Sequence, residues 1–473
     1  MEKSQGKRES WGSRIGFIMA AAGSAVGLGN IWRFPYLTGT NGGGAFILIY
    51  LVFVLGVGLS IMTAEFAVGR RANLAAVGAF KKFDKRFTFI GVLGVLSAFF
   101  IMGFYPVVGG WALAYVFKSV TGLLSNQAAI GDAFGAFISG SYEPLIWMLI
   151  YLFANIVIVA RGVQGGIEKA SKIMMPMLYV LLIIIAIRSI TLPGAGSGLE
   201  FILKPDFSQV TGSTFLAALG QAFFSLSLGM GCMLTYGSYL SKEENLQKNA
   251  LIVTLMDTSV ALLAAIAIFP ALFAFGMEPA VGPGLVFVVV PSVFAQMGGL
   301  GVILSVIFFV ALTLAALTSS VSLLEVVTAY LIDERRMERK KATYLAGGIM
   351  VITGTLSSLS LGALSGFNVL GLGVGFFDFF DILTDKIFLA IGGMVIAIFV
   401  GWFMKKEDLK DELTNSGTVE FGLFEVWYAV TKYIIPLAIG AVAVAGILSI
   451  EQTALMIFGI VLIAVLAIFS KKL

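Results

Sequence analysis

A series of long apolar runs, separated by short polar segments, constrains the fold of this chain more than any other feature. Hydrophobic residues make up 59% and charged residues 12% of the 473 residues, whereas a soluble domain has about 25% charged residues. The runs lie at 14–36, 45–69, 88–117, 144–160, 170–190, 215–239, 247–276, 296–331, 342–361, 382–404, 427–450 and 452–470. Because about 17–25 apolar residues suffice to cross a lipid bilayer, the sequence predicts an all-α integral membrane protein with about 12 transmembrane helices.

The positive charges are divided unequally between the two sides of these expected helices. Of the 31 Lys and Arg residues, 26 fall on one side and five on the other. The five are Arg33, Lys118, Arg188, Lys204 and Lys386. Because loops rich in Lys and Arg stay in the cytoplasm, we expect a multi-pass protein of the cell membrane with both termini in the cytoplasm.

The composition also excludes several kinds of chemistry. One cysteine, Cys232, and no histidine rule out a disulfide framework, Cys/His metal sites and histidine acid–base catalysis. The run FFDFFD at 376–381 raises the alternative of an intramembrane aspartyl protease, but the GxGD context of such enzymes is missing. We therefore expect no enzyme and no nucleic-acid partner. Because no nucleotide-binding motif is present, an ion gradient is the expected energy source for any transport across the membrane.

Two of the apolar runs are interrupted at corresponding positions. GSAVGLGN occupies 23–30 in the first run, and SLSLGMG occupies 225–231 in the sixth. Glycines in a membrane helix alternatively serve close helix packing, but two breaks in register, each with hydroxyl or amide side chains, favour unwound segments at a transporter's central site. The expected organisation is an N-terminal cytoplasmic segment (1–13), helices 1–5 (14–190), helices 6–10 (191–404), and a cytoplasmic loop with helices 11 and 12 (405–473).

The breaks belong to segments that resemble a known family. WGSRIGFIMAAAGSAVGLGNIWRFPY and NGGGAFILIY, at 11–36 and 41–50, are similar to the opening of the neurotransmitter:sodium symporter family, and GQAFFSLSLGMG and LTSSVS are similar to its helices 6 and 8. The resemblance implies a LeuT-type 5+5 inverted repeat with broken helices 1 and 6. It also implies sodium-coupled symport by alternating access. A non-transporting amino-acid sensor on the same fold is the alternative.

The resemblance further implies two bound sodium ions. The first site would use oxygen atoms of Ala25, Asn30, Ser225 and Asp257 together with the substrate carboxylate. The second site would use Gly23, Val26, Ala315, Thr318 and Ser319. The alternative for Thr318 and Ser319 is that their hydroxyls only bond carbonyls of their own helix.

The same resemblance assigns the substrate contacts. The carboxylate would rest on the N–H groups of Leu28 and Gly29 and the hydroxyl of Tyr105, and the ammonium would meet Ser24, Ala25, Phe224, Ser225 and Ser227. The side-chain pocket would be lined by Ile101, Tyr105, Phe224, Met230, Ser319 and Leu323, each of which alone would pass for ordinary core. Family members that carry monoamines have an aspartate where this chain has Gly27. We therefore expect neutral hydrophobic amino acids, aromatic ones included.

An acidic residue inside a membrane span is a functional candidate by default. Chloride-dependent family members hold the anion near the positions of Tyr50, Gln221, Ser225 and residue 261, which is alanine here. We expect the carboxylate of Asp257 to replace that chloride, so that uptake is chloride-independent. The alternative is that Asp257 is only hydrogen-bonded to its neighbours. Glu65 is expected to support the broken helices, and Glu325 is unassigned.

The resemblance places a gate on either side of the substrate. Arg33 would pair with Asp381 on the outer side, with Asp378 as a rival partner. Arg8 would pair with Asp333 on the inner side, with Trp11 packed beneath them, unless Arg8 and Asp333 are ordinary surface charges. The segment from Gly166 to Pro176 would unwind to admit water, although a plain helix kink explains the same residues.

Overall fold

The computed structural model describes residues 9–279 and 282–473, and this part of the chain is helical, with a single isolated β-bridge between Gly43 and Pro205. Nine of the described helical segments are long and apolar enough to cross a membrane, and one bent pair makes a tenth. The nine are Gly44–Ala72 with α3 (Gly44–Phe53) and α4 (Leu59–Ala72), Lys85–Val120 with α6 (Thr88–Val120), Glu143–Ala160 (α8), Val163–Ile190 with α9 (Lys169–Ile190), Leu246–Ala274 (α13), Gly299–Arg335 (α15), Arg339–Ser360 (α16), Phe376–Phe403 with α17 and α18, and Phe424–Leu448 with α20 and α21. The expected all-α membrane architecture is confirmed.

The first and sixth expected spans are both divided, as the sequence predicts. In the first, α1 (Arg14–Ala25) is followed after a short gap by a π-helical turn, η1 (Gly29–Arg33), and by α2 (Phe34–Thr40), with a bend of 50°. In the sixth, α11 (Gly212–Ser225) and α12 (Cys232–Gly237) are separated by the non-helical residues 226–231. The last expected span is α22 (Thr453–Ile468), with 16 residues. The division of the chain into two repeats at residue 190 stays a prediction.

The divided spans end where the local residues allow it. The hydroxyl of Ser13 accepts a hydrogen bond from the N–H of Gly16 and so caps the start of α1. At its other end, Val26 has extended backbone angles. In the sixth span, Gly229 and Gly231 have φ angles of +78° and +77°, which only glycine adopts at little cost. These glycines therefore allow the non-helical backbone between α11 and α12.

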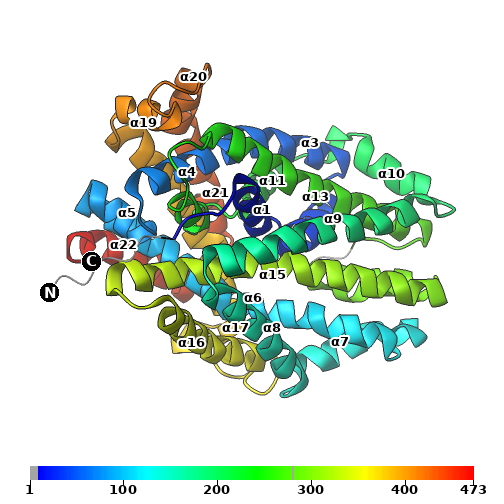
Figure 1. Ribbon diagram of the computed structural model, residues 1–473. Helices are drawn as coiled ribbons and strands as arrows, with labels where there is room; N and C mark the ends of the chain where they lie inside the picture. Colours follow the sequence, from blue (N-terminus) through cyan, green and yellow to red (C-terminus); the bar gives the residue numbers. More distant parts are fainter. Residues whose placement is uncertain (1–8, 280–281) are drawn as a thin grey trace.

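The long helix α15 forms the centre of the packing. Its 37 residues span about 55 Å, and it packs against α6, α8, α9 and α16. The short helix α1 lies against α9, α13 and α15, so the first break is enclosed by other helices. Figure 1 shows the C-terminus, α5 (Ala76–Phe83) and α19 (Lys406–Leu413) at one end of the molecule, and α7 (Ile130–Ser139) and α10 (Ala195–Leu203) at the other.

A buried ion pair attaches α19 to the rest of the bundle. The carboxylate of Glu412 accepts hydrogen bonds from Arg70 Nε and Lys242 Nζ, both at 2.6 Å. The Arg70 guanidinium also donates to the carbonyl of Glu244 at 2.6 Å. The side chains of Arg70 and Glu412 are 1% and 3% exposed. The pair therefore joins α19 to the end of α4 and to the segment that follows α12.

Glu412→Gln should destabilise the protein, because it leaves the buried Arg70 guanidinium without a compensating charge. Breaking one half of a buried pair costs about 3–5 kcal/mol of the free energy of unfolding. Cys232 is the single cysteine and is fully buried, so a thiol-reactive fluorescent dye reports unfolding. Glu200→Gln removes one half of an exposed pair, Glu200–Lys204, and serves as the control. Equal melting temperatures for the two variants would contradict this role of Glu412.

Candidate functional site

The two breaks lie side by side and are joined by hydrogen bonds to freed backbone carbonyls. The hydroxyl of Ser227 donates to the carbonyl of Ser24 at 2.8 Å, and the amide of Gln221 donates to the carbonyl of Gly29 at 2.8 Å. Ser227 has a φ of +54°, a conformation that costs a non-glycine residue of order 1–3 kcal/mol. The bond to Ser24 helps to hold it there. Two backbone carbonyls of the first break are thus satisfied by side chains of the sixth span.

A buried polar cluster joins the first break to α11 and α13, and we call it the Asn30 cluster. The Asn30 amide nitrogen lies 2.7 Å from Asp257 Oδ1 and 3.1 Å from Ser225 Oγ. The Ser225 hydroxyl in turn donates to Asp257 Oδ2 at 2.7 Å, and the Tyr50 hydroxyl lies 3.4 Å from the same oxygen. All four side chains are fully or almost fully buried. All three side chains expected to bind the first sodium ion, those of Asn30, Ser225 and Asp257, are therefore brought together, with Tyr50 beside them.

A second carboxylate supports the other break. Glu65 Oε1 accepts a hydrogen bond from the N–H of Gly229 at 2.8 Å, and the side chain is fully buried in α4. This is the supporting contact expected from the sequence. Ser24 is held on the opposite side by Ser322, with 2.7 Å between the two hydroxyl oxygens. The positions of both unwound segments are thus fixed by neighbouring helices.

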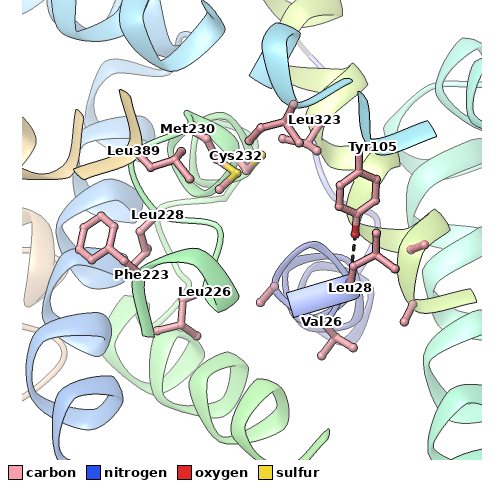
Figure 2. Close-up of a cluster of buried hydrophobic side chains, with 14 of the residues drawn as sticks. Val26, Leu28, Tyr105, Phe223, Leu226, Leu228, Met230, Cys232, Leu323 and Leu389 are labelled. Carbon is pink, nitrogen blue, oxygen red and sulfur yellow. Dashed lines mark hydrogen bonds between the residues drawn. The ribbon is translucent and has the colours of Figure 1, made fainter. Parts of the chain in front are cut away.

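A small cavity of about 20 Å³ lies between the two breaks, α6 and α15, and in this conformation its volume is far below that of a typical ligand pocket. It is lined by Ala25, Gly27, Gly29, Ile101, Tyr105, Phe224, Ser227, Met230, Ser319 and Leu323. All six residues expected to form the side-chain pocket are in this lining. Figure 2 shows the Tyr105 hydroxyl directed at Leu28, with Leu323 near Tyr105 and Met230 near Cys232. The substrate-binding role of these residues stays a prediction.

One end of this cavity carries hydrogen-bonding groups. The N–H of Leu28 donates to the Tyr105 hydroxyl at 3.1 Å, so the two groups expected to hold a carboxylate are adjacent. A Cβ atom at Gly27 would lie 2.7 Å from the Tyr105 hydroxyl and 3.0 Å from Ser319 Oγ. Side chains are therefore excluded at position 27 in this arrangement, and the aspartate of monoamine carriers has no room here.

The residues expected at the second sodium site are also close together. A Cβ atom at Gly23 would lie 3.0 Å from Thr318 Cβ, so α1 and α15 approach closely at this level. The Thr318 hydroxyl donates to the carbonyls of Leu314 and Ala315 at 3.1 and 3.0 Å, which is the alternative raised by the sequence. Because donation uses only the proton, the hydroxyl oxygen keeps lone pairs that can bind a cation. Both roles are therefore compatible.

The prediction that Arg33 pairs with Asp381, or with Asp378, is wrong. Its guanidinium forms an ion pair with Asp385 at 3.0 Å and not with Asp381 or Asp378, and it lies 4.8 Å from the ring centroid of Phe224. The segment from Leu383 to Phe388 is π-helical. Its wider turn changes the face on which residues after Asp381 point. The outer ion pair therefore lies one turn further along the chain than predicted.

The inner pair can be described only in part, because Arg8 lies outside the described residues. Asp333 accepts a hydrogen bond from the N–H of Ala75 at 2.7 Å. The indole N–H of Trp11 donates to the carbonyl of Tyr236 at 3.0 Å, and its ring makes edge contacts with Phe17 and Tyr236. Trp11 therefore packs against α1 and α12, and its place beneath the Arg8–Asp333 pair stays a prediction.

Two acidic residues near this end have partners that the sequence did not indicate. Arg339 binds both oxygens of Glu325 at 2.7 and 2.9 Å, and the Tyr239 hydroxyl donates to Glu325 at 2.6 Å. Glu168 accepts hydrogen bonds from Gly12 N–H and the Ser13 hydroxyl at 2.7 and 2.9 Å. These partners are far apart in sequence, so only the fold brings them together.

Comparison with known proteins identifies the family. The model of the sodium:neurotransmitter symporter family matches residues 8–131 and 138–465. The chain belongs to this family. It is 41% identical to the sodium-dependent transporter YhdH of Bacillus subtilis (strain 168), with 92% of this chain and 97% of YhdH covered. It is 38% identical to a sodium-dependent transporter of Haemophilus influenzae, with 93% and 98% covered.

A solved structure of the family agrees with the fold. The crystal structure of MhsT in complex with L-phenylalanine is 46% identical in sequence to this chain, covering 93% of this chain and all of MhsT, with a TM-score of 0.84. MhsT is a LeuT-fold member of the symporter family. The family membership implied by the motifs around both breaks is thereby confirmed. The chain is a sodium-dependent transporter of this family.

Ser225→Ala should weaken sodium binding, because it removes the hydroxyl that joins Asn30 to Asp257. Loss of a buried hydrogen bond of this kind predicts a roughly tenfold rise in the sodium concentration that gives half-maximal thermal stabilisation. The labelling of Cys232 again reports unfolding. Ser197→Ala, on the exposed side of α10, is the control. An unchanged sodium midpoint for Ser225→Ala would show that the Asn30 cluster does not form a sodium site.

Proposed function

We propose that this symporter carries neutral hydrophobic amino acids, aromatic ones included, into the cell together with two sodium ions and without chloride. The proposal places it in the cell membrane with both termini in the cytoplasm, in line with the uneven distribution of its Lys and Arg residues. The observation that carries the proposal is the apolar cavity between two broken helices, with hydrogen-bonding groups at one end and the Asn30 cluster beside it.

The two ends of an amino acid match the groups in the cavity. The Leu28 N–H and the Tyr105 hydroxyl, 3.1 Å apart, would donate to the carboxylate, and Gly29 offers a third N–H. The carbonyls of Ser24, Ala25, Phe224 and Ser225 and the hydroxyl of Ser227 would receive the ammonium. A zwitterion that is paired at both ends avoids the cost of bare charges in an apolar interior.

The rest of the cavity favours an uncharged side chain. The side chains of Ile101, Phe224, Met230 and Leu323 on its walls are apolar, and no Asp, Glu, Lys or Arg lines it. A flexible methionine adapts to guests of different shape. MhsT, which is 46% identical, has been crystallised with L-phenylalanine, and this supports an aromatic or large aliphatic substrate.

Sodium fits the proposed ion sites because their ligands are oxygens. Hard cations prefer carbonyl, hydroxyl and carboxylate ligands, and the described residues contain no cluster of three His, Cys, Asp or Glu side chains that would favour another metal. One ion would bind Ala25, Asn30, Ser225, Asp257 and the substrate carboxylate. The other would bind Gly23, Val26, Ala315, Thr318 and Ser319. The shared carboxylate would couple substrate binding to the first ion.

Asp257 supplies the charge that chloride supplies in other members. Its carboxylate accepts from Ser225 at 2.7 Å and lies 3.4 Å from the Tyr50 hydroxyl, two groups that the family resemblance assigns to the anion. Gln221 lies nearby on α11, and residue 261 is a buried alanine. A fixed negative charge beside the first ion leaves chloride without a role. The relatives found are named as transporters, which gives no support to the alternative of a sensor.

Purified protein in liposomes should accumulate labelled L-phenylalanine when an inward sodium gradient is imposed. Unlabelled leucine, methionine, tyrosine and tryptophan should compete, whereas glutamate and lysine should not, because the cavity offers their charges no partner. The same gradient made with potassium is the control. Competition by none of the twenty amino acids, together with no sodium-dependent uptake, would refute the proposal.

Replacing chloride by gluconate should leave the initial rate of uptake unchanged. Asp257→Asn should lower that rate roughly tenfold in gluconate, because the charge-assisted hydrogen bonds from Asn30 and Ser225 are lost. Asp132→Asn, an exposed carboxylate on α7, is the matched control. Uptake that disappears with chloride in the unmodified protein would contradict the role given to Asp257.

Asp385→Asn should slow uptake more than Asp381→Asn, because Arg33 pairs with Asp385 above the cavity. Loss of this partly exposed pair should reduce the rate by several-fold rather than abolish it, since such pairs are worth up to about 1 kcal/mol. Asp378→Asn is the control, and the initial rate of sodium-driven uptake is the measurement. A larger loss for Asp381→Asn would restore the partner predicted from the sequence.

A further inference from the structure

A group of aromatic and basic side chains lies where two membrane helices end beside α19. It consists of Trp402, Lys406, Tyr428, Lys432 and Tyr433, and we call it the Lys432 cluster. Trp402 belongs to the π-helical turn η11 (Phe399–Phe403) that follows α18 (Leu389–Ile398), and Lys432 belongs to the π-helical turn η12 (Val430–Ile434) that precedes α21 (Ile435–Leu448). The two turns contact each other. No part of the transport site described above involves them.

The backbone fixes the positions of the rings in this cluster. The indole N–H of Trp402 donates to the carbonyl of Lys432, and the Tyr428 hydroxyl donates to the carbonyl of Gly401, both at 3.0 Å. The two helices approach so closely that a Cβ atom at Gly401 would lie 2.6 Å from the Lys432 Cα. The aromatic rings are therefore held in place before any ligand binds.

The Lys432 ammonium is surrounded by rings but has no counter-charge. It lies 4.6, 5.5 and 5.6 Å from the ring centroids of Trp402, Tyr428 and Tyr433. Within the described residues, no carboxylate lies within 4.0 Å of the Lys432 ammonium. The carboxylate of Glu425 pairs instead with Lys406, at 2.6 Å. The Lys406 ammonium also lies 5.4 Å from the Tyr428 centroid. Lys432 therefore keeps a positive charge that no ion pair within the described residues balances.

The open side of the cluster faces the membrane. Trp402 and Tyr433 are 56% and 54% exposed, and the neighbouring Phe403 and Ile434 are about equally exposed, at 50% and 55%. Exposed aromatic side chains on membrane helices concentrate at the level of the lipid headgroups. Lys432 is eight residues, about 12 Å, from the start of its helix. A flexible lysine at this depth reaches the headgroup region.

We propose that the Lys432 cluster binds the phosphate of an anionic phospholipid, such as phosphatidylglycerol, in the leaflet on the side of α19. The lysine ammonium has three donors, and attraction to aromatic rings does not neutralise its charge. The phosphodiester of the lipid supplies the negative charge that Lys432 lacks, and the acyl chains of the lipid would lie along Trp402, Phe403 and Ile434. Basic pockets between membrane helices bind lipid headgroups in this way. The proposal does not depend on the identity of the transported substrate.

The test is native mass spectrometry of the purified full-length chain, titrated with phosphatidylglycerol or with phosphatidylcholine of the same acyl chains. The unmodified protein should retain phosphatidylglycerol in preference to phosphatidylcholine. Lys432→Gln should lower the affinity for phosphatidylglycerol about fivefold, whereas Lys432→Arg should keep it. Lys341→Gln, which removes an exposed lysine near the start of α16, is the charge-matched control. Melting of each variant without lipid shows whether it is folded.

Three results would overturn the proposal. The first is equal retention of phosphatidylglycerol by Lys432→Gln and by the unmodified protein. The second is equal affinity of the unmodified protein for phosphatidylglycerol and phosphatidylcholine. The third is displacement of phosphatidylglycerol by inorganic phosphate at a comparable concentration, which would indicate a site for a soluble anion rather than for a lipid.

Discussion

The contact between the Asn30 amide and the Asp257 carboxylate, 2.7 Å across a fully buried interface, is the interaction on which the site depends. Unwound backbone inside a membrane protein must find partners within the protein, because none is available in lipid. At the first break the Asn30 side chain accepts a hydrogen bond from the N–H of Gly27, and at the second break Glu65 accepts one from the N–H of Gly229. The broken helices are therefore stable because neighbouring helices supply the missing partners.

The same cluster explains how a poor membrane helix becomes a binding site. Carbonyls released by unwinding are ligands for a cation, and released N–H groups are donors for a carboxylate. In this chain both kinds of group border one cavity, with Gly27 allowing Tyr105 and Ser319 to approach. We propose that the Arg33–Asp385 pair closes the cavity on one side and that Trp11, with the Glu168 contacts, closes it on the other. Movement of these two closures in turn is what alternating access requires.

Much of this could be predicted from the sequence because the informative residues are local. The breaks at 23–30 and 225–231 are visible as glycines within apolar runs, and the lining residues follow from motifs around them. The partner of Arg33 could not be predicted, because a π-helical turn at Leu383–Phe388 shifts the register that an ordinary helix would keep. The Arg70–Glu412 pair was not predicted either, since it depends on packing between segments that are distant in the sequence.

The most direct measurement of the coupling at the Asn30 cluster is the affinity for L-phenylalanine as a function of sodium concentration. If the substrate carboxylate completes the first sodium site, each ligand must raise the affinity for the other by the same factor. Calorimetric titration should then show a dissociation constant for phenylalanine that falls steadily as sodium is raised, with no binding in potassium alone. A dissociation constant that is the same in sodium and in potassium would contradict this coupling.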